Sequence, residues 1–170
     1  AQVTQSFGPV RNQYADVSRL GVDRWLAMVA AYQRSGSACM IVDAGTALTV
    51  DVLNDDGLHL GGYILPGLEL MRSSLEQHTA IRLGDLQQGL SLAPGNSTNE
   101  AVGNGVNAAV VGAIRQALAR LSGENDTVKL YVSGGDAPVL RPLLAAVPGL
   151  HVEEVQDLVF EGLALICPMD

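Results

Sequence analysis

The chain has 170 residues, of which 48% are hydrophobic and only 4% aromatic, so it is long enough for one domain with an aliphatic core. Its formal net charge of −8 argues against nucleic acid as a partner, since binding a phosphate backbone needs clustered lysine and arginine, but it leaves room for a single nucleotide. No apolar run is long enough for a membrane span and no signal peptide is visible, so we expect no membrane partner and a cytoplasmic location.

Cysteine and histidine give no sign of a metal site or a disulfide framework. Cys39 and Cys167 each lie in an apolar run, which predicts two reduced core residues. His59, His78 and His151 have no cysteine or histidine partner at metal-ligand spacing. We interpret all three histidines as surface or strand residues.

The first third of the chain predicts a helix followed by three strands. Residues 1–9 are polar and interrupted by glycine and proline, which is typical of a tail or linker. Apolar residues then recur at helical spacing from about Val17 to Arg34. Short β-branched runs separated by turn residues follow, and they predict three antiparallel strands at 38–42, 48–53 and 58–64.

The rest of the chain predicts helices alternating with single strands. Ser97 and Glu100 have the spacing of a capping box, so a long amphipathic helix should begin there. The mixed order of elements predicts an α/β fold, with a mixed sheet flanked by helices. The other expected elements are helices near 68–77, 139–146 and 158–166 and strands near 130–132 and 151–155.

The turn between the first two strands carries Asp43, Gly45 and Thr46. Glycine lets backbone N–H groups approach phosphate oxygens, threonine adds a hydroxyl donor, and an aspartate can face a cation. An ordinary hairpin with polar turn residues explains the same pattern. The turn alone does not decide between these two interpretations.

Five motifs follow one another from residue 21 to residue 137, and together they resemble type III pantothenate kinase, a family of the actin-like, sugar-kinase and heat-shock-ATPase superfamily. The resemblance implies an actin-like ATPase lobe with a ribonuclease H-like fold. It also implies transfer of the ATP γ-phosphoryl group to pantothenate, which gives 4'-phosphopantothenate in the first step of coenzyme A biosynthesis. The motifs are Gly-Val-Asp-Arg (21–24), Val-Asp-Ala-Gly-Thr-Ala (42–47), Gly-Gly-Tyr-Ile-Leu-Pro-Gly (61–67), Ser-Thr-Asn-Glu-Ala-Val-Gly-Asn-Gly (97–105) and Ser-Gly-Gly-Asp-Ala (133–137).

Members of this family have a longer chain, whose first lobe opens with an Asp-x-Gly-Asn phosphate-binding turn that does not occur here before Gly21. The chain resembles the C-terminal two thirds of a member, so we expect the N-terminal lobe to be missing. Residues 1–36 would be the end of the first lobe with the substrate-binding helix, and 37–170 the C-terminal lobe. An alternative is a non-catalytic regulatory or accessory relative, or an isolated lobe, on the same scaffold.

The resemblance implies that Asp23 is the catalytic base, since an ionised carboxylate can accept the proton of the substrate hydroxyl. The alternative is that Asp23 is an ordinary solvent-exposed aspartate of a helix. The implied pantothenate contacts are Tyr14, Gly21, Val22, Arg24 and Thr98. Without the resemblance, Arg24 would be interpreted as a surface salt bridge, Tyr14 as a partly buried aromatic residue and Thr98 as part of a helix cap.

The resemblance also assigns the nucleotide side of the site. Asp43 would bind a monovalent cation, K⁺ or NH₄⁺, while Gly45, Thr46, Gly134 and Gly135 would contact ATP. For each glycine, the alternative is an ordinary turn. Mg²⁺ would arrive with ATP and be held mainly by phosphates and water. The family completes its site across a homodimer, so we expect a homodimer here.

Overall fold

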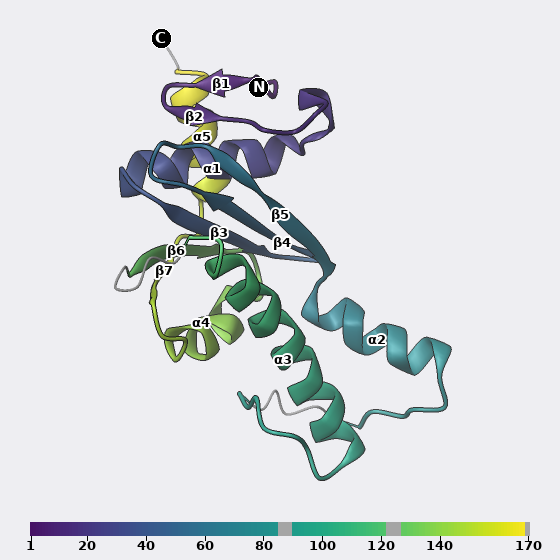
Figure 1. Ribbon diagram of the computed structural model, residues 1–170. Coiled ribbons are helices and arrows are strands. Elements are labelled where there is room, and N and C mark those ends of the chain that lie inside the picture. The colour runs from purple at the N-terminus through teal and green to yellow at the C-terminus, as the bar shows by residue number, and fades with distance from the viewer. Residues whose placement is uncertain (85–89, 122–126, 169–170) are drawn as a thin grey trace.

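The residues that a computed structural model describes, 1–84, 90–121 and 127–168, form a mixed five-stranded sheet between two layers of helices (Figure 1). The strands of this sheet are β3 (Cys39–Ala44), β4 (Ala47–Leu53), β5 (His59–Pro66), β6 (Val128–Ser133) and β7 (Leu150–Glu154). They lie in the order β5-β4-β3-β6-β7. Pairing is antiparallel from β3 through β4 to β5, and parallel from β3 through β6 to β7.

The sheet separates two hydrophobic clusters, because successive side chains of a strand point to opposite faces. Met40 and Val42 of β3 belong to one cluster, together with residues of α3 (Thr98–Leu118) and α4 (Ala137–Ala145). Cys39 and Ile41 belong to the other, together with residues of α1 (Val22–Ser35) and α5 (Leu158–Ile166). Strand β3 is therefore buried on both faces, which explains its unbroken apolar run.

Helix α2 (Leu68–His78) follows β5 and, like the first part of α3, extends beyond the sheet (Figure 1). The predicted cap of α3 is confirmed, because the Ser97 hydroxyl oxygen accepts the Glu100 N–H at 3.2 Å. The Glu100 carboxylate accepts the N–H of Asn96 at 2.8 Å. Within the described ranges, no helix combines the length and hydropathy needed to cross a membrane.

The prediction of a tail over residues 1–9 is wrong. Strands β1 (Ser6–Phe7) and β2 (Val10–Arg11) pair as a short antiparallel hairpin. Val10 is buried against the cluster formed by α1 and α5. One apolar side chain in a polar segment gave too weak a pattern to predict this packing.

The start of the first long helix and the exposure of Cys167 also differ from the prediction. The first long helix begins at Val22 rather than Val17, because the chain first makes a short 3-10 turn whose Ser18 N–H bonds to the Asp16 carboxylate at 3.0 Å. Cys167 is exposed rather than part of the core, since it lies at the end of α5. The division of the chain at residue 36 stays a prediction.

Helix α5 crosses α1 so closely that a Cβ atom at Gly162 would collide with the main chain of Leu26. We therefore expect Gly162→Ala to lower the free energy of unfolding by about 1–3 kcal/mol, as overpacking commonly does. Urea denaturation followed by circular dichroism measures this change.

The matched control is Gly112→Ala in α3, where a Cβ meets nothing within 4 Å. The control should raise stability by up to about 1 kcal/mol, since alanine is the better helix former. Equal effects of the two substitutions would contradict the packing argument.

Candidate active site

The turn that joins β3 to β4 lies between the first residues of two helices. The N–H of Gly67, which precedes α2, donates to the Thr46 carbonyl at 2.8 Å. The N–H of Asp136, which precedes α4, donates to the Ala44 carbonyl at 3.0 Å. A helix N-terminus presents free N–H groups and the positive end of the helix dipole. The turn is thus set among groups that favour a bound anion.

Glycine is required at two of these contacts. A Cβ at Gly67 would collide with the carbonyl oxygen of Gly45. Gly134 has a φ of +92°, and a Cβ there would lie 2.5 Å from the Ala44 carbonyl oxygen. These close approaches bring the loop after β6 against the turn after β3 and leave a cleft of about 500 Å³ beside them. The cleft is lined by Ala44, Gly45, Thr46, Glu69, Leu70, Ser73, Gly135 and Asp136.

Asp43 is half-buried near the end of β3 and directly precedes Ala44, which lines this cleft. The Ser133 hydroxyl of β6 bonds to its carboxylate at 3.4 Å. Burial raises the pKa of Asp43; the Ser133 hydrogen bond opposes this, and the negative charge of Asp23 adds to it. The carboxylates of Asp43 and Asp23 are therefore close enough to repel each other, and a cation between them would relieve this repulsion.

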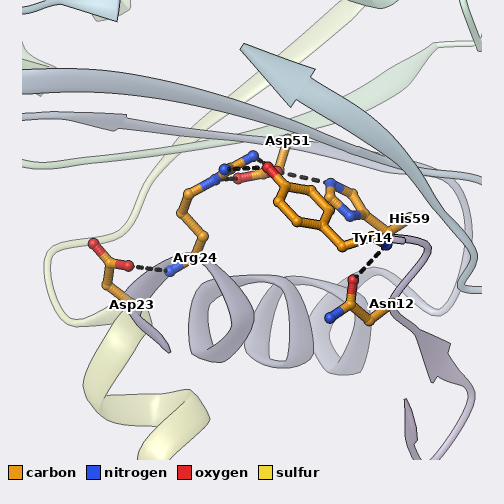
Figure 2. Close-up of polar contacts among 6 residues, drawn as sticks. All are labelled: Asn12, Tyr14, Asp23, Arg24, Asp51 and His59. Carbon is orange, nitrogen blue, oxygen red and sulfur yellow. Dashed lines mark hydrogen bonds and ion pairs between the residues drawn. The ribbon is translucent and has the colours of Figure 1, made fainter. Parts of the chain in front are cut away.

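Asp23 lies exposed in the first turn of α1. Its carboxylate accepts the backbone N–H of Arg24 at 2.8 Å (Figure 2). The positive end of the α1 dipole favours a negative charge at this position. The carboxylate thus has a fixed direction while the side chain remains accessible.

The next residue, Arg24, is buried, with 6% of its side chain exposed. Its Nε donates to Asp51 Oδ2 at 2.9 Å and its Nη2 donates to Asp51 Oδ1 at 2.6 Å. Its Nη1 donates to the Tyr14 hydroxyl oxygen at 2.8 Å. His59 Nε2 lies 2.8 Å from Asp51 Oδ1, and the His59 ring stacks on the Tyr14 ring with centroids 5.9 Å apart and planes 15° apart. The four side chains form a closed ring of contacts, which we call the Asp51 ring (Figure 2).

The charges in the Asp51 ring depend on one another. Burial alone would raise the pKa of Asp51, but the hydrogen bonds from His59 and Arg24 outweigh it and lower that pKa. Burial alone would lower the pKa of Arg24, but Asp51 and Tyr14 outweigh it and raise that pKa. A buried ion pair of this kind is favourable only while both partners remain.

This geometry changes the interpretation of two predicted residues. The edge of the Arg24 guanidinium formed by Nε and Nη2 is occupied by Asp51, so Arg24 forms a buried ion pair rather than the surface salt bridge considered as its alternative. His59 is a strand residue as expected, but it is fully buried and hydrogen-bonded. Asp51 was not singled out in the sequence. The available signal was an acidic residue inside a β-branched run, since a buried carboxylate needs a partner.

The remaining predicted residues are divided between two regions. Gly21 and the exposed Val22 lie at the start of α1, beside Asp23. Thr98 begins α3, which lies on the opposite face of the sheet from α1 and starts at the end farther from the sheet (Figure 1). Thr98 lines a pocket together with Pro66 and Leu70, and Leu70 also lines the cleft beside Gly45 and Thr46. Among the residues with assigned positions, no group of three or more His, Cys, Asp or Glu side chains gathers to hold a metal ion.

A family model described as type III pantothenate kinase matches residues 2–120. The chain belongs to the type III pantothenate kinase family. A curated member from Pseudomonas aeruginosa (strain LESB58) is 45% identical in an alignment 168 residues long, which covers 95% of this chain and 65% of that protein. The chain therefore spans just under two thirds of that relative of the same family.

Solved structures agree on the fold. A structure from Campylobacter jejuni, named a conserved Baf family transcriptional activator, is 28% identical with a TM-score of 0.68, over 92% of this chain and 66% of that one. A structure from Sinorhizobium meliloti, named a 2-dehydro-3-deoxygalactonokinase protein, is 20% identical with a TM-score of 0.56, over 86% of this chain and 60% of that one. The second similarity shows the fold alone.

Removing the Asp51 carboxylate should destabilise the protein strongly, because Arg24 would remain buried without its partner. We expect Asp51→Ala to lower the free energy of unfolding at pH 7 by about 3–5 kcal/mol, measured by urea denaturation. The control is Asp56→Ala in the exposed turn before β5, which should change it by less than about 0.5 kcal/mol.

The pH dependence of the free energy of unfolding provides a second test of this ion pair. The pKa of Asp51 is lower in the folded protein than its ordinary 3.8, so its stabilisation is present above that value and is lost as the pH falls through the lowered pKa. The difference in stability between wild type and Asp51→Ala should shrink over that acid range. A difference that stays constant down to the acid-unfolding limit would show that the charge of Asp51 is not what stabilises the fold.

Proposed function

We propose that this chain carries out the phosphoryl transfer of its family, from ATP to the hydroxyl of pantothenate, giving ADP and 4'-phosphopantothenate. One observation carries the proposal: the turn after β3, which directly follows Asp43, lines a cleft with the loop after β6, whose Gly134 approaches the turn closely. Phosphoryl transfer needs positioned phosphates, charge neutralisation and an oriented nucleophile, and little further covalent chemistry from the protein. The reaction is the first step toward coenzyme A, and we propose that it takes place in the cytoplasm.

Asp23 is the group that we assign to the substrate hydroxyl. Its carboxylate accepts the proton as the hydroxyl oxygen attacks the γ-phosphorus and the bond to the β,γ-bridging oxygen breaks, which leaves ADP. Pantothenate would be held by the residues around Asp23, which form one wall of the site: Gly21, Val22, Arg24 and Tyr14. In this wall Tyr14 is half-buried and Val22 is exposed, so both can meet a ligand.

The glycine-lined cleft would hold the nucleotide, with Gly45, Thr46, Gly134 and Gly135 against its phosphates. Glu69 and Asp136 in the lining, with Asp43 beside it, make the region acidic, so a polyphosphate needs cations for charge neutralisation. Mg²⁺ bound to the phosphates supplies that neutralisation. The half-buried Asp43, which faces the charge of Asp23, fits a monovalent cation such as K⁺ or NH₄⁺.

We further propose a homodimer in which Thr98 serves the site of the partner subunit. Thr98 is exposed at the start of α3, and α3 packs on the opposite face of the sheet from α1, which carries Asp23. A second copy could bring the two together. Size-exclusion chromatography with light scattering, at several protein concentrations, tests the oligomeric state.

Asp23→Asn keeps the shape of the side chain but removes the proton acceptor. We expect kcat to fall by about 100- to 10,000-fold, the usual contribution of a general base, with little change in KM for ATP. A coupled assay with ATP, Mg²⁺, K⁺ and pantothenate, together with mass spectrometry of the product, measures this. Asp56→Asn should retain full activity. Full activity of Asp23→Asn would remove Asp23 from the role, and absence of phosphopantothenate with the wild-type chain would overturn the proposed reaction.

Asp43→Asn tests the cation site. Because its pKa is raised by burial and by Asp23, the Asp43 charge costs the ligand-free protein stability above the ordinary value of 3.8. The variant should therefore melt at the same or a higher temperature than wild type at pH 7. We expect K⁺, compared with equal ionic strength of a large organic cation, to raise the melting temperature of wild type only. Equal K⁺ effects on both proteins would exclude Asp43 as a ligand.

A regulatory protein is the second candidate, because the structure from Campylobacter jejuni carries the name of a transcriptional activator. On this alternative, the cleft binds a nucleotide but no phosphoryl group moves. The net charge of −8 disfavours direct contact with DNA. A thermal shift with ATP, without any phosphopantothenate formed, would favour this second function.

A further inference from the structure

The Asp51 ring contains two residues, Asp51 and His59, to which neither the sequence motifs nor the proposed reaction assigns a role. Both side chains are almost fully buried, with exposed fractions of 2% and 0%, so neither can touch a substrate directly. Both contact residues that we assign to pantothenate, namely Arg24 and Tyr14. Any effect on substrate must pass through these two.

The hydrogen-bond directions in the ring leave donors available. A guanidinium has five N–H donors, and Arg24 uses two on Asp51 and one on Tyr14, so one remains on each terminal nitrogen. The Tyr14 oxygen accepts from Arg24, and its own O–H proton has no acceptor among the described residues. A charged donor on the phenol oxygen strengthens the O–H as a donor. Arg24 is buried, with 6% of its side chain exposed, whereas Tyr14 is half-buried, so the donor that the ring can offer to an acceptor group is the Tyr14 O–H.

The position of Tyr14 is fixed from three sides (Figure 2). The His59 ring lies parallel to its ring, Arg24 bonds its hydroxyl, and the buried Asn12 side chain accepts its backbone N–H at 2.9 Å. Asp51 connects the first two of these contacts, because its Oδ1 bonds both His59 and Arg24. Loss of Asp51 would free Arg24 and His59 together, and Tyr14 with them.

We propose that Asp51, supported by His59, is a positioning residue for the pantothenate site: it holds Arg24 and, through Arg24 and His59, the Tyr14 hydroxyl, so that this donor meets an acceptor oxygen of the substrate. This inference rests on the proposed function. Because Asp51 has no assigned contact with ATP, the inference predicts that loss of Asp51 weakens pantothenate binding but not ATP binding. A role in stability alone would weaken the fold without favouring one substrate over the other.

The test compares pantothenate and ATP binding by the whole chain, using titration calorimetry with Mg²⁺ and K⁺ present and a temperature at which circular dichroism shows each variant folded. We expect Asp51→Asn to weaken pantothenate binding by about 10- to 100-fold, the range expected when a charge-assisted hydrogen bond is lost. ATP binding should change by less than about twofold. Asp56→Asn, the same change in the exposed turn nearby, should alter neither.

A second pair of variants covers the case in which Asp51→Asn does not fold. His59→Phe keeps a flat ring beside Tyr14 but removes the bond to Asp51, whereas Tyr14→Phe keeps the stacking but removes the hydroxyl. Each should weaken pantothenate binding by about 3- to 30-fold and leave ATP binding unchanged, and the double variant should lose less than the product of the two losses.

Three results would overturn the inference. Pantothenate binding by folded Asp51→Asn, or by His59→Phe, that equals the wild-type affinity would exclude positioning through the ring. Equal weakening of both substrates would reduce Asp51 to a residue needed for stability. A wild-type chain that binds ATP but no pantothenate would overturn the proposed function itself and the inference with it, and this outcome is visible before any variant is made.

Discussion

The buried ion pair between Arg24 and Asp51 is the constraint on which the arrangement of the site depends. It joins α1 to β4, two elements whose contact residues are 27 positions apart in the chain. A charge with so little access to water must be matched closely in distance and direction. Because Arg24 is fixed in this way, the backbone at Asp23 directly before it is also held, and the negative charge of Asp23 contributes to the raised pKa of Asp43 at the end of β3.

The site combines few positive side chains with several carboxylates, a combination that suits a nucleotide only with added cations. Glu69 and Asp136 line the cleft, and Asp43 directly precedes Ala44 in its lining. The attraction for phosphate must come instead from main-chain N–H groups in the glycine turns and from the first turns of α2 and α4. Under the proposed function, these groups would let an acidic protein hold the phosphates of ATP.

Much of the fold followed from local patterns. Alternating and continuous apolar runs predicted the strands of the main sheet, and the Ser97 cap marked the start of α3 correctly. The errors fell where a single long-range contact decided the outcome. Val10 is held by packing against another element, and Cys167 is exposed because its helix ends there. Neither contact has a periodic signal in the sequence.

The types of element, the glycine turns and the membership of the type III pantothenate kinase family could be predicted from the sequence alone. Each depends on short runs of neighbouring residues. Which side chains meet depends on the tertiary structure. The Arg24 guanidinium is paired with Asp51, the buried His59 ring is stacked on Tyr14, and the charge of Asp23 acts on Asp43. The reason is physical: pairing of buried charges depends on distances between elements far apart in the chain, and those distances are set by the packing of the whole sheet and its helices.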